Sequence, residues 1–275
     1  MRFALVVTVL AALAAGCGNA FVVTDSFTPP PSSGDPPDSL HDYVVGTDVT
    51  LRVRPSRGFI DTSKVKVVSK HPELVTVDDQ SEKSGVITVK LHAVKEGTAA
   101  VDFLDDNQRP IEERVIQVKL PDAIELAVDV DPSRGYTLPV VDPDALVVAA
   151  GGSVTFRVTY EKGGAELKGV GVLVGETSLL TVRNPTKSSP DREFVTLLAP
   201  PGSTDSGDVT LRVHDEDITT LKARIASVDE IAAIQLDEGP APEFPTDGTV
   251  FVVWAKAFTK DAAPVFGAPI AWSFD

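Results

Sequence analysis

The chain has a single cysteine, Cys17, among its 275 residues. One cysteine excludes an intramolecular disulfide and a cysteine-based zinc site, so each folded unit must be stable through packing alone. Basic residues are also few, because 25 Lys and Arg face 40 Asp and Glu, for a formal net charge of −15. This balance argues against binding to nucleic acids or anionic membrane surfaces, which needs clustered positive charge.

Catalytic motifs are missing as well. The four histidines are scattered, and no two of them have the spacing of metal ligands. The sequence has neither a Gly-x-Ser-x-Gly elbow nor a phosphate-binding glycine loop. We therefore predict that the protein is not an enzyme. The histidines are His41, His71, His92 and His214.

A long apolar run is absent from the N-terminus, where the apolar segment 3–16 is shorter than the roughly 20 residues that span a bilayer. The segment follows Arg2 and ends in small residues, which is the pattern of a secretory signal peptide over residues 1–16. Cleavage by an ordinary signal peptidase would leave Cys17 as a stray thiol. A lone thiol in an oxidising compartment invites unwanted pairing, whereas an acylated cysteine is inert.

Residues 13–17, LAAGC, resemble the lipobox of bacterial lipoproteins. The resemblance implies that Cys17 is diacylated, becomes the new N-terminus and anchors the chain in a membrane. Two or three acyl chains make a stable anchor, whereas one binds only marginally. Ala14 departs from the family, which most often has Leu there. In this family Gly18 after the cysteine implies sorting to the outer membrane.

Residues 28–37, TPPPSSGDPP, cannot form a helix or a central strand because of their prolines. We expect a semi-rigid, extended spacer here, so that residues 17–40 form a lipidated, Pro-rich tether. The segment 21–27, FVVTDSF, has a second interpretation as a first strand, with the prolines as its loop. The sequence leaves both interpretations open.

Beyond residue 40 the sequence alternates between apolar and polar residues. VTLRVRP at 49–55 and GVITVKLHAV at 85–94 both follow this period of two. Strict alternation marks half-buried strands of antiparallel sheets. Gly, Pro, Asp and Asn interrupt the runs at short intervals, as in a β-sandwich. The sequence therefore predicts an all-β fold.

The chain also repeats itself at a spacing of about one hundred residues, the size of an immunoglobulin-type sandwich. GTDVTLRV at 46–53 matches GGSVTFRV at 151–158 and the start of DGTVFVVW at 247–254. PDAIELAVD at 121–129 matches VDEIAAIQLD at 228–237. These matches predict tandem Ig-like antiparallel β-sandwiches.

We place the first Ig-like domain at residues 41–120, the second at 121–227, and the start of an incomplete third at 228–275. The repeat predicts about fifty further residues for the third domain. A half-sandwich exposes its edges and its core. Three alternatives follow: the chain is a fragment, which we favour, the last segment packs onto the second domain, or a partner completes it by strand addition.

The segment SKHPELVTVDD, followed by GVITVKLHAVKEGTAAVDFLDDN, resembles a bacterial Ig-like (BIG-type) domain over most of residues 43–118. The second domain matches less well, since APPGSTDSGD at 199–208 stands where the family has a tight turn. The third, ending DAAPVFGAPIAWSFD, is similar to the Ig-like repeats of bacterial adhesins. The resemblance implies a spacer, a stalk or an adhesive arm, and fold-level analogy is weak evidence for any of these.

Acidic residues gather around one expected loop of the second domain. Carboxylates that converge at a domain junction could bind Ca²⁺, which takes six to eight oxygen ligands. The alternative is that Asp favours turns and keeps strand edges soluble. We therefore expect no cofactor, with calcium as the weaker alternative. The candidate ligands are Asp129, Asp131, Asp142 and Asp144.

The leading hypothesis is a lipid-anchored cell-envelope protein whose Ig-like domains act as a non-catalytic spacer or binding arm. Its expected partners are the membrane, through the N-terminal lipid, and a protein or polysaccharide ligand. In the alternative hypothesis the domains are a stalk for an enzyme or a carbohydrate-binding domain encoded beyond Asp275. A third hypothesis is an envelope assembly subunit, whose last segment needs a partner strand.

Overall fold

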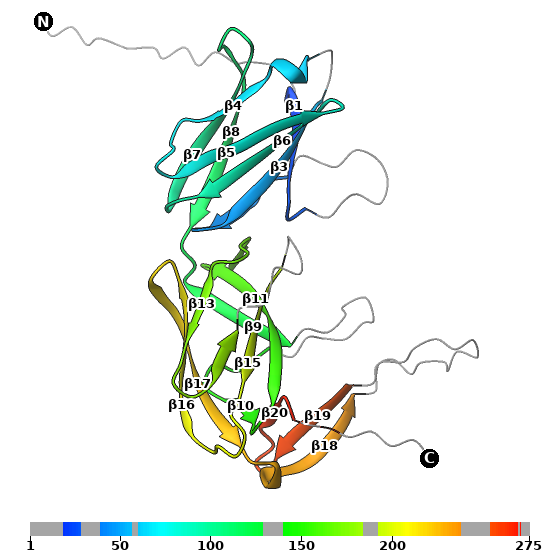
Figure 1. The fold of residues 1–275 in the computed structure, drawn as a ribbon, viewed down its shortest axis with the longest axis vertical. Coiled ribbons are helices and arrows are strands. Elements are labelled where there is room, and N and C mark those ends of the chain that lie inside the picture. The colour runs from blue at the N-terminus through cyan, green and yellow to red at the C-terminus, as the bar shows by residue number, and fades with distance from the viewer. Residues whose placement is uncertain are drawn as a thin grey trace, which may run out of the picture.

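The computed structural model describes residues 19–28, 39–56, 60–128, 140–183, 192–237 and 254–268, together with Ile270. Within these ranges the chain is built of β-strands, and its helices are the short turns Thr62–Lys64 and Val228–Glu230. Figure 1 shows two β-sandwiches, here called the first and second modules, placed end to end, with a third group of strands at the far end of the second. The fold is the expected series of all-β sandwiches.

The first module consists of two four-stranded sheets that enclose one apolar core. Their strand orders are β1-β3-β6-β5 and β2-β8-β7-β4. Along β3 the predicted alternation is confirmed, because Val49, Leu51 and Val53 are buried and Arg52 and Arg54 are exposed. The strands are β1 (Phe21–Asp25), β2 (Asp42–Val44), β3 (Asp48–Pro55), β4 (Lys66–Ser69), β5 (Val75–Lys83), β6 (Val86–Ala93), β7 (Gly97–Leu104) and β8 (Pro110–Lys119).

Strand β1 lies inside residues 17–40, the stretch in which we expected a tether. It pairs with β3 in antiparallel register, with Phe21 opposite Pro55. Of the two interpretations left open for residues 21–27, the structure therefore supports the first strand. The proline-rich stretch 28–37 connects β1 with β2, which belong to the same sandwich. Residues 29–37 themselves lie outside the described ranges, and along the chain they join two strands of the first module.

The second module packs two sheets around another apolar core, which includes Leu126, Phe156 and Leu211. One sheet has the order β12-β11-β15-β14, with β9 also paired to β11, and the other begins β13-β16-β17-β10. The strands are β9 (Ala123–Val128), β10 (Leu146–Ala149), β11 (Ser153–Lys162), β12 (Ala165–Leu167), β13 (Leu173–Glu176), β14 (Thr181–Arg183), β15 (Glu193–Leu198), β16 (Ser206–Val213) and β17 (Glu216–Ala226).

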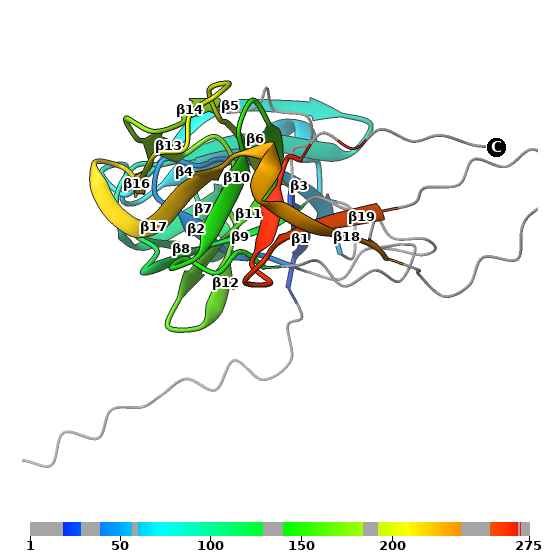
Figure 2. The same cartoon turned by 90° about the horizontal axis from the view of Figure 1, so that it is seen from below.

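The last three strands extend a sheet of the second module. They are β18 (Ile231–Asp237), β19 (Trp254–Thr259) and β20 (Pro264–Phe266). Strand β20 pairs in parallel with β10, and β19 and β18 follow it in the same sheet, as the view in Figure 2 also shows. Of the three alternatives for the segment 228–275, its described strands support packing onto the second module.

Candidate binding site at the module junction

Strand β2 belongs to the first module but also hydrogen-bonds to the second. It pairs in parallel with β8, and Tyr43 forms a parallel bridge with Lys168, which follows β12. The N–H of Val44 donates to the carbonyl oxygen of Lys168 at 2.9 Å, and the N–H of Lys168 donates to the carbonyl oxygen of Asp42 at 2.8 Å. These bonds hold the ends of the two modules together.

A buried carboxylate lies at the junction end of the first module. The side chain of Asp25 has no exposed area, and it accepts hydrogen bonds from Tyr43 Oη at 2.5 Å and from the N–H groups of Phe27 and Thr28. His41 Nδ1 lies 2.7 Å from Asp25 Oδ2. Burial raises the pKa of Asp25, but the hydrogen bonds from Tyr43, His41 and Thr28 outweigh burial and lower it. Asp25 is therefore held as a carboxylate.

A second buried acid lies on the other side of the junction. Glu193, the first residue of β15, accepts hydrogen bonds from Tyr160 Oη and, at 3.2 Å, from the N–H of Leu173. Burial raises the pKa of Glu193 above its usual range, and these hydrogen bonds offset only part of that effect. Burial and the nearby Glu193 charge also raise the pKa of Tyr160.

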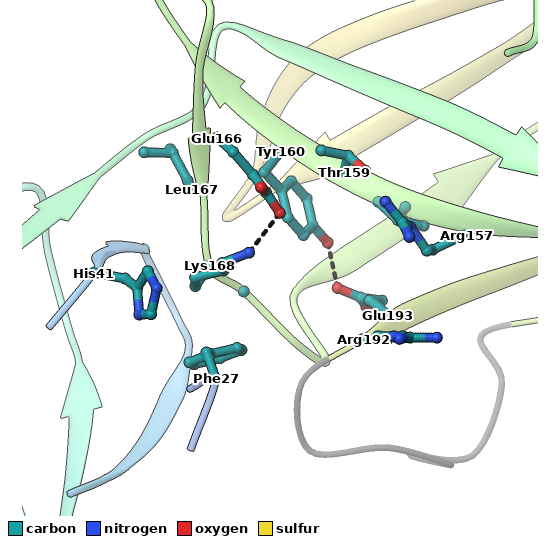
Figure 3. A pocket seen from close by; sticks show the side chains of 12 residues that line it. Phe27, His41, Arg157, Thr159, Tyr160, Glu166, Leu167, Lys168, Arg192 and Glu193 are labelled. Carbon is teal, nitrogen blue, oxygen red and sulfur yellow. Dashed lines mark hydrogen bonds and ion pairs between the residues drawn. The ribbon is translucent and has the colours of Figure 1, made fainter. Parts of the chain in front are cut away.

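A cavity of about 360 Å³ lies at the junction, and Glu193 is part of its lining. Phe27 and His41 line it from the first module, and residues of β11, β12 and the start of β15 line it from the second (Figure 3). Pockets for small ligands usually measure about 300–1,000 Å³, and they combine concave shape with a few polar groups. The junction cavity has both properties.

Basic side chains surround this cavity although the chain as a whole is acidic. Arg157, Lys168 and Arg192 lie around it in Figure 3. Lys168 Nζ is 2.6 Å from Glu166 Oε1, whereas Arg157 forms no ion pair with any carboxylate among the described residues. A guanidinium group offers donors in a fixed fork that matches a carboxylate. The lining also includes Glu166 and Glu193, so Arg157 is the cation best placed to bind an anionic group of a ligand.

Of the four histidines, His41 lines this cavity, whereas Asp142 and Asp144, the candidate ligands that the structure describes, do not. Cys17, Asp129 and Asp131 fall outside the described residues. Asp142 and Asp144 lie in the turn before β10, where Asp142 Oδ1 accepts the N–H of Asp144 at 2.9 Å. In the described ranges no three His, Cys, Asp or Glu side chains are grouped so as to hold a metal ion.

The junction acids were missed by the motif search, although their positions carry a signal. Phe21, Val23 and Asp25 share the core-facing side of β1, so a carboxylate occupies an apolar position. Glu193 and Val195 likewise share the core-facing side of β15. A carboxylate at such a position needs hydrogen-bond partners in the core. The sequence does not identify those partners, because Tyr43 and Tyr160 come from other strands.

None of the helices in the described ranges has the length and apolar character needed to cross a membrane. No family model matches the chain, and no curated protein matches it. Solved structures do show similarity. The Escherichia coli adhesin FdeC is 16% identical with a TM-score of 0.29, over 90% of this chain and 76% of that one.

Two further structures have similar values. Domains 4 and 5 of the S-layer protein SbsC are 17% identical with a TM-score of 0.27, over 63% of this chain and 82% of that one. The Yersinia pseudotuberculosis adhesin InvE is 15% identical with a TM-score of 0.26, over 67% of this chain and 56% of that one. These TM-scores are too low to transfer a function, so the proposals below depend on the contacts of this chain.

Proposed function

We propose that this protein is anchored by a lipid on Cys17 in the bacterial cell envelope, at the outer membrane, and that its Ig-like modules act as a non-catalytic spacer or adhesive arm. One observation carries the proposal: successive sandwiches are stacked end to end and joined by backbone hydrogen bonds (Figure 1). A chain built in this way separates its two ends by a defined length, which is what a spacer or an arm requires.

The anchor is tested by the intact mass of the native protein extracted with detergent. We expect a chain that begins at Cys17 and carries acyl chains. A Cys17→Ser variant should move from the membrane fraction to the soluble fraction, while its far-ultraviolet circular dichroism stays unchanged. An unacylated N-terminus elsewhere would overturn the anchor. A much larger mass would favour a stalk that carries a further domain beyond Asp275.

For the binding role, the junction cavity offers a place for a carboxylate-bearing ligand, because Arg157, Lys168 and Arg192 line it. Two probes for isothermal titration share this chemistry: an oligosaccharide of glucuronic acid and a peptide of glutamate residues. We expect one of them to bind. Arg157→Ser should then weaken binding about tenfold, since a hydrogen bond to a charged group contributes about 1.5–3 kcal/mol.

The matched control for this titration is Arg54→Ser, an exposed arginine of β3 that does not line the cavity. It should bind the probe as the unchanged protein does. Equal loss in both variants would indicate a general charge effect. If neither probe binds, the cavity has no role in recognition, and the mass measurement still decides the anchor.

A further inference from the structure

Strand β2 is buried on both faces, and each face packs in the core of a different module. Tyr43 and the adjoining Val45 belong to the core of the first module. Val44, between them in sequence, belongs to the core of the second module. All three side chains are at most 3% exposed. A strand whose neighbouring residues enter two different cores is shared by two modules.

Strand β10 repeats this arrangement one module further along. Leu146 and Val148 belong to the core of the second module. Val147 and Ala149 belong instead to a separate cluster, in which Val265 of β20 also lies. All four residues of β10 are buried. The second module therefore shares β10 with the strands that follow it, as the first shares β2.

The two junctions also correspond residue by residue. The matching segments 46–53 and 151–158 place Val148 105 positions after Tyr43. Tyr43 bridges Lys168 in parallel, and Val148 pairs in parallel with Phe266, which is 98 positions after Lys168. The register of the strand contact is thus the same at both junctions.

The turn that follows each shared strand is the same as well. The N–H of Thr47 donates to the carbonyl oxygen of Val44 at 3.1 Å, and the N–H of Gly152 donates to that of Ala149 at 2.8 Å. Glycine precedes the donor in both turns, with φ of 88° at Gly46 and 73° at Gly151. This left-handed conformation favours glycine.

A glycine faces this turn from the next module at each junction. At Gly169 an added Cβ would lie 2.8 Å from Val44 Cβ and 3.2 Å from Thr47 Oγ1. At Gly267, 98 positions later, it would lie 2.9 Å from the backbone nitrogen of Ser153. Real Cβ atoms essentially never lie within 3.0 Å of such atoms, so each junction closes to this distance only because a glycine is present.

We infer that β2 and β10 are docking strands, each of which receives a backbone segment and a glycine from the strands that follow its own module. The partner that fits this surface is a segment such as Leu167–Gly169 or Val265–Gly267. Each contact combines parallel backbone pairing, apolar side chains and a close glycine approach. Successive modules are thereby fixed at one angle, and the chain is a stiff arm. The inference holds whether or not Cys17 carries a lipid.

Stiffness is not the default between modules of one chain. Interfaces between domains are usually small and polar, so that domains move relative to one another. Here the hydrogen-bonded backbone limits translation along the strand, and Val44 inserted into the second core limits rotation about it. The arrangement predicts one narrow distribution of distances between the first and second modules.

Pulsed electron paramagnetic resonance measures this distribution in the full chain. Cys17→Ser removes the native thiol, and spin labels are attached through Lys90→Cys and Lys222→Cys, exposed positions of the first and second modules. We expect a single narrow distance. Gly169→Ala should broaden the distribution about twofold, because the added methyl group forces Val44 out of place and frees the inter-module motion that is otherwise the default.

The control variant is Gly207→Ala in β16, where the nearest atom to an added Cβ is 3.8 Å away. It should keep the distribution narrow. The inference is overturned if the distance distribution of the parent protein is already broad, or if the distribution of Gly169→Ala is as narrow as that of Gly207→Ala.

Discussion

Two carboxylates at the junction occupy positions that the strand pattern assigns to the core, and their pKa values are shifted in opposite directions. Asp25 is surrounded by donors, and its pKa is lowered. For Glu193, burial outweighs the hydrogen bonds that it accepts, and its pKa is raised. Each acid is paired with a buried tyrosine, Tyr43 or Tyr160. The balance between burial and hydrogen bonding therefore decides the direction in which each pKa is shifted.

Asp25→Asn should lower the free energy of unfolding by about 3 kcal/mol at pH 7, because it replaces a carboxylate in a buried network of donors. A lowered pKa gives stability that is present above the unfolded value of 3.8 and is lost as the pH falls through the folded value. The difference from the unchanged protein should therefore shrink as the pH falls below 3.8.

Urea denaturation followed by circular dichroism at pH 7 and pH 3 measures this difference. Asp48→Asn is the control, because the Asp48 carboxylate is 68% exposed while it also contacts a histidine ring, His92, at 2.8 Å. Its effect should stay within about 0.5 kcal/mol at both pH values. An Asp25→Asn effect of the same size at pH 3 and pH 7 would contradict the lowered pKa.

Glu193→Gln should show the opposite dependence on pH. A raised pKa gives stability that is fully present below the unfolded value of 4.5 and is lost as the pH rises through the folded value. The stability of the unchanged protein relative to Glu193→Gln should therefore fall as the pH increases from 4.5. The same denaturation series measures it, and a relative stability that rises over this window would show that the assigned direction is wrong.

At the scale of elements, the shared strands connect the cores of successive modules. Val44 is the last residue of β2 and Val45 follows it, yet Val44 packs with the second module and Val45 with the first. A strand that is buried on both faces loses the alternation by which half-buried strands are found. Substitutions at these two positions should consequently act at different places in the molecule.

Val44→Ala should destabilise the second module by about 2 kcal/mol, and Val45→Ala the first, since each removes buried methyl groups and leaves a cavity. Hydrogen exchange with mass spectrometry separates the two effects. Val44→Ala should speed exchange in β11 and β15, and Val45→Ala in β3 and β6. If both variants act only on the first module, β2 is not a shared strand.

The strand pattern of the sequence predicts much of this architecture. Alternation along 49–55 and 85–94 locates β3 and β6, and the repeats locate β9, β11 and the start of β18. The shared strands are not predicted in the same way. Leu146–Ala149 is a short apolar run without alternation, which fits several kinds of buried segment. Its second face is covered by strands that come later in the chain, and the local sequence does not identify those strands.

At the scale of the whole molecule, the connection between the modules is itself packed. Leu120 contacts both cores, and the N–H of Asp122 donates to the carbonyl oxygen of Glu161 at 2.9 Å. The carboxylate of Asp122 accepts the N–H of Gly163 at 3.0 Å. Linkers between independent domains are usually exposed and make few contacts.

The endoproteinase Asp-N should therefore fail to cut before Asp122 in the folded protein, because cleavage needs local unfolding of the connection. Mass spectrometry of a limited digest checks this. The bond should become sensitive at the urea concentration at which the modules unfold, with a digest in 8 M urea as the positive control. Early accumulation of two fragments that meet at Asp122 would indicate modules that move independently.

The role of the proline-rich stretch illustrates what composition alone cannot decide. Ten residues with many prolines suit either an extended tether or a connection between strands, because both lack regular hydrogen bonding. The pairing of β1 with β3 distinguishes the two. The buried acids show the same limit of sequence analysis. A carboxylate at a core-facing position predicts a hydrogen-bond partner, but the sequence does not indicate which strand supplies that partner.

For the proposed anchor on Cys17, the position of β1 limits the distance between the membrane and the first module. Phe21 is four residues after Cys17. Because an extended chain reaches at most about 3.6 Å per residue, at most about 14 Å separates a lipidated Cys17 from the start of β1. With a linker this short, the first sandwich would lie close to the lipid headgroups. The distance of the far end from the membrane would then be set by the number of stacked modules. A few residues inserted ahead of Phe21 would let the whole stack of modules tilt relative to the membrane.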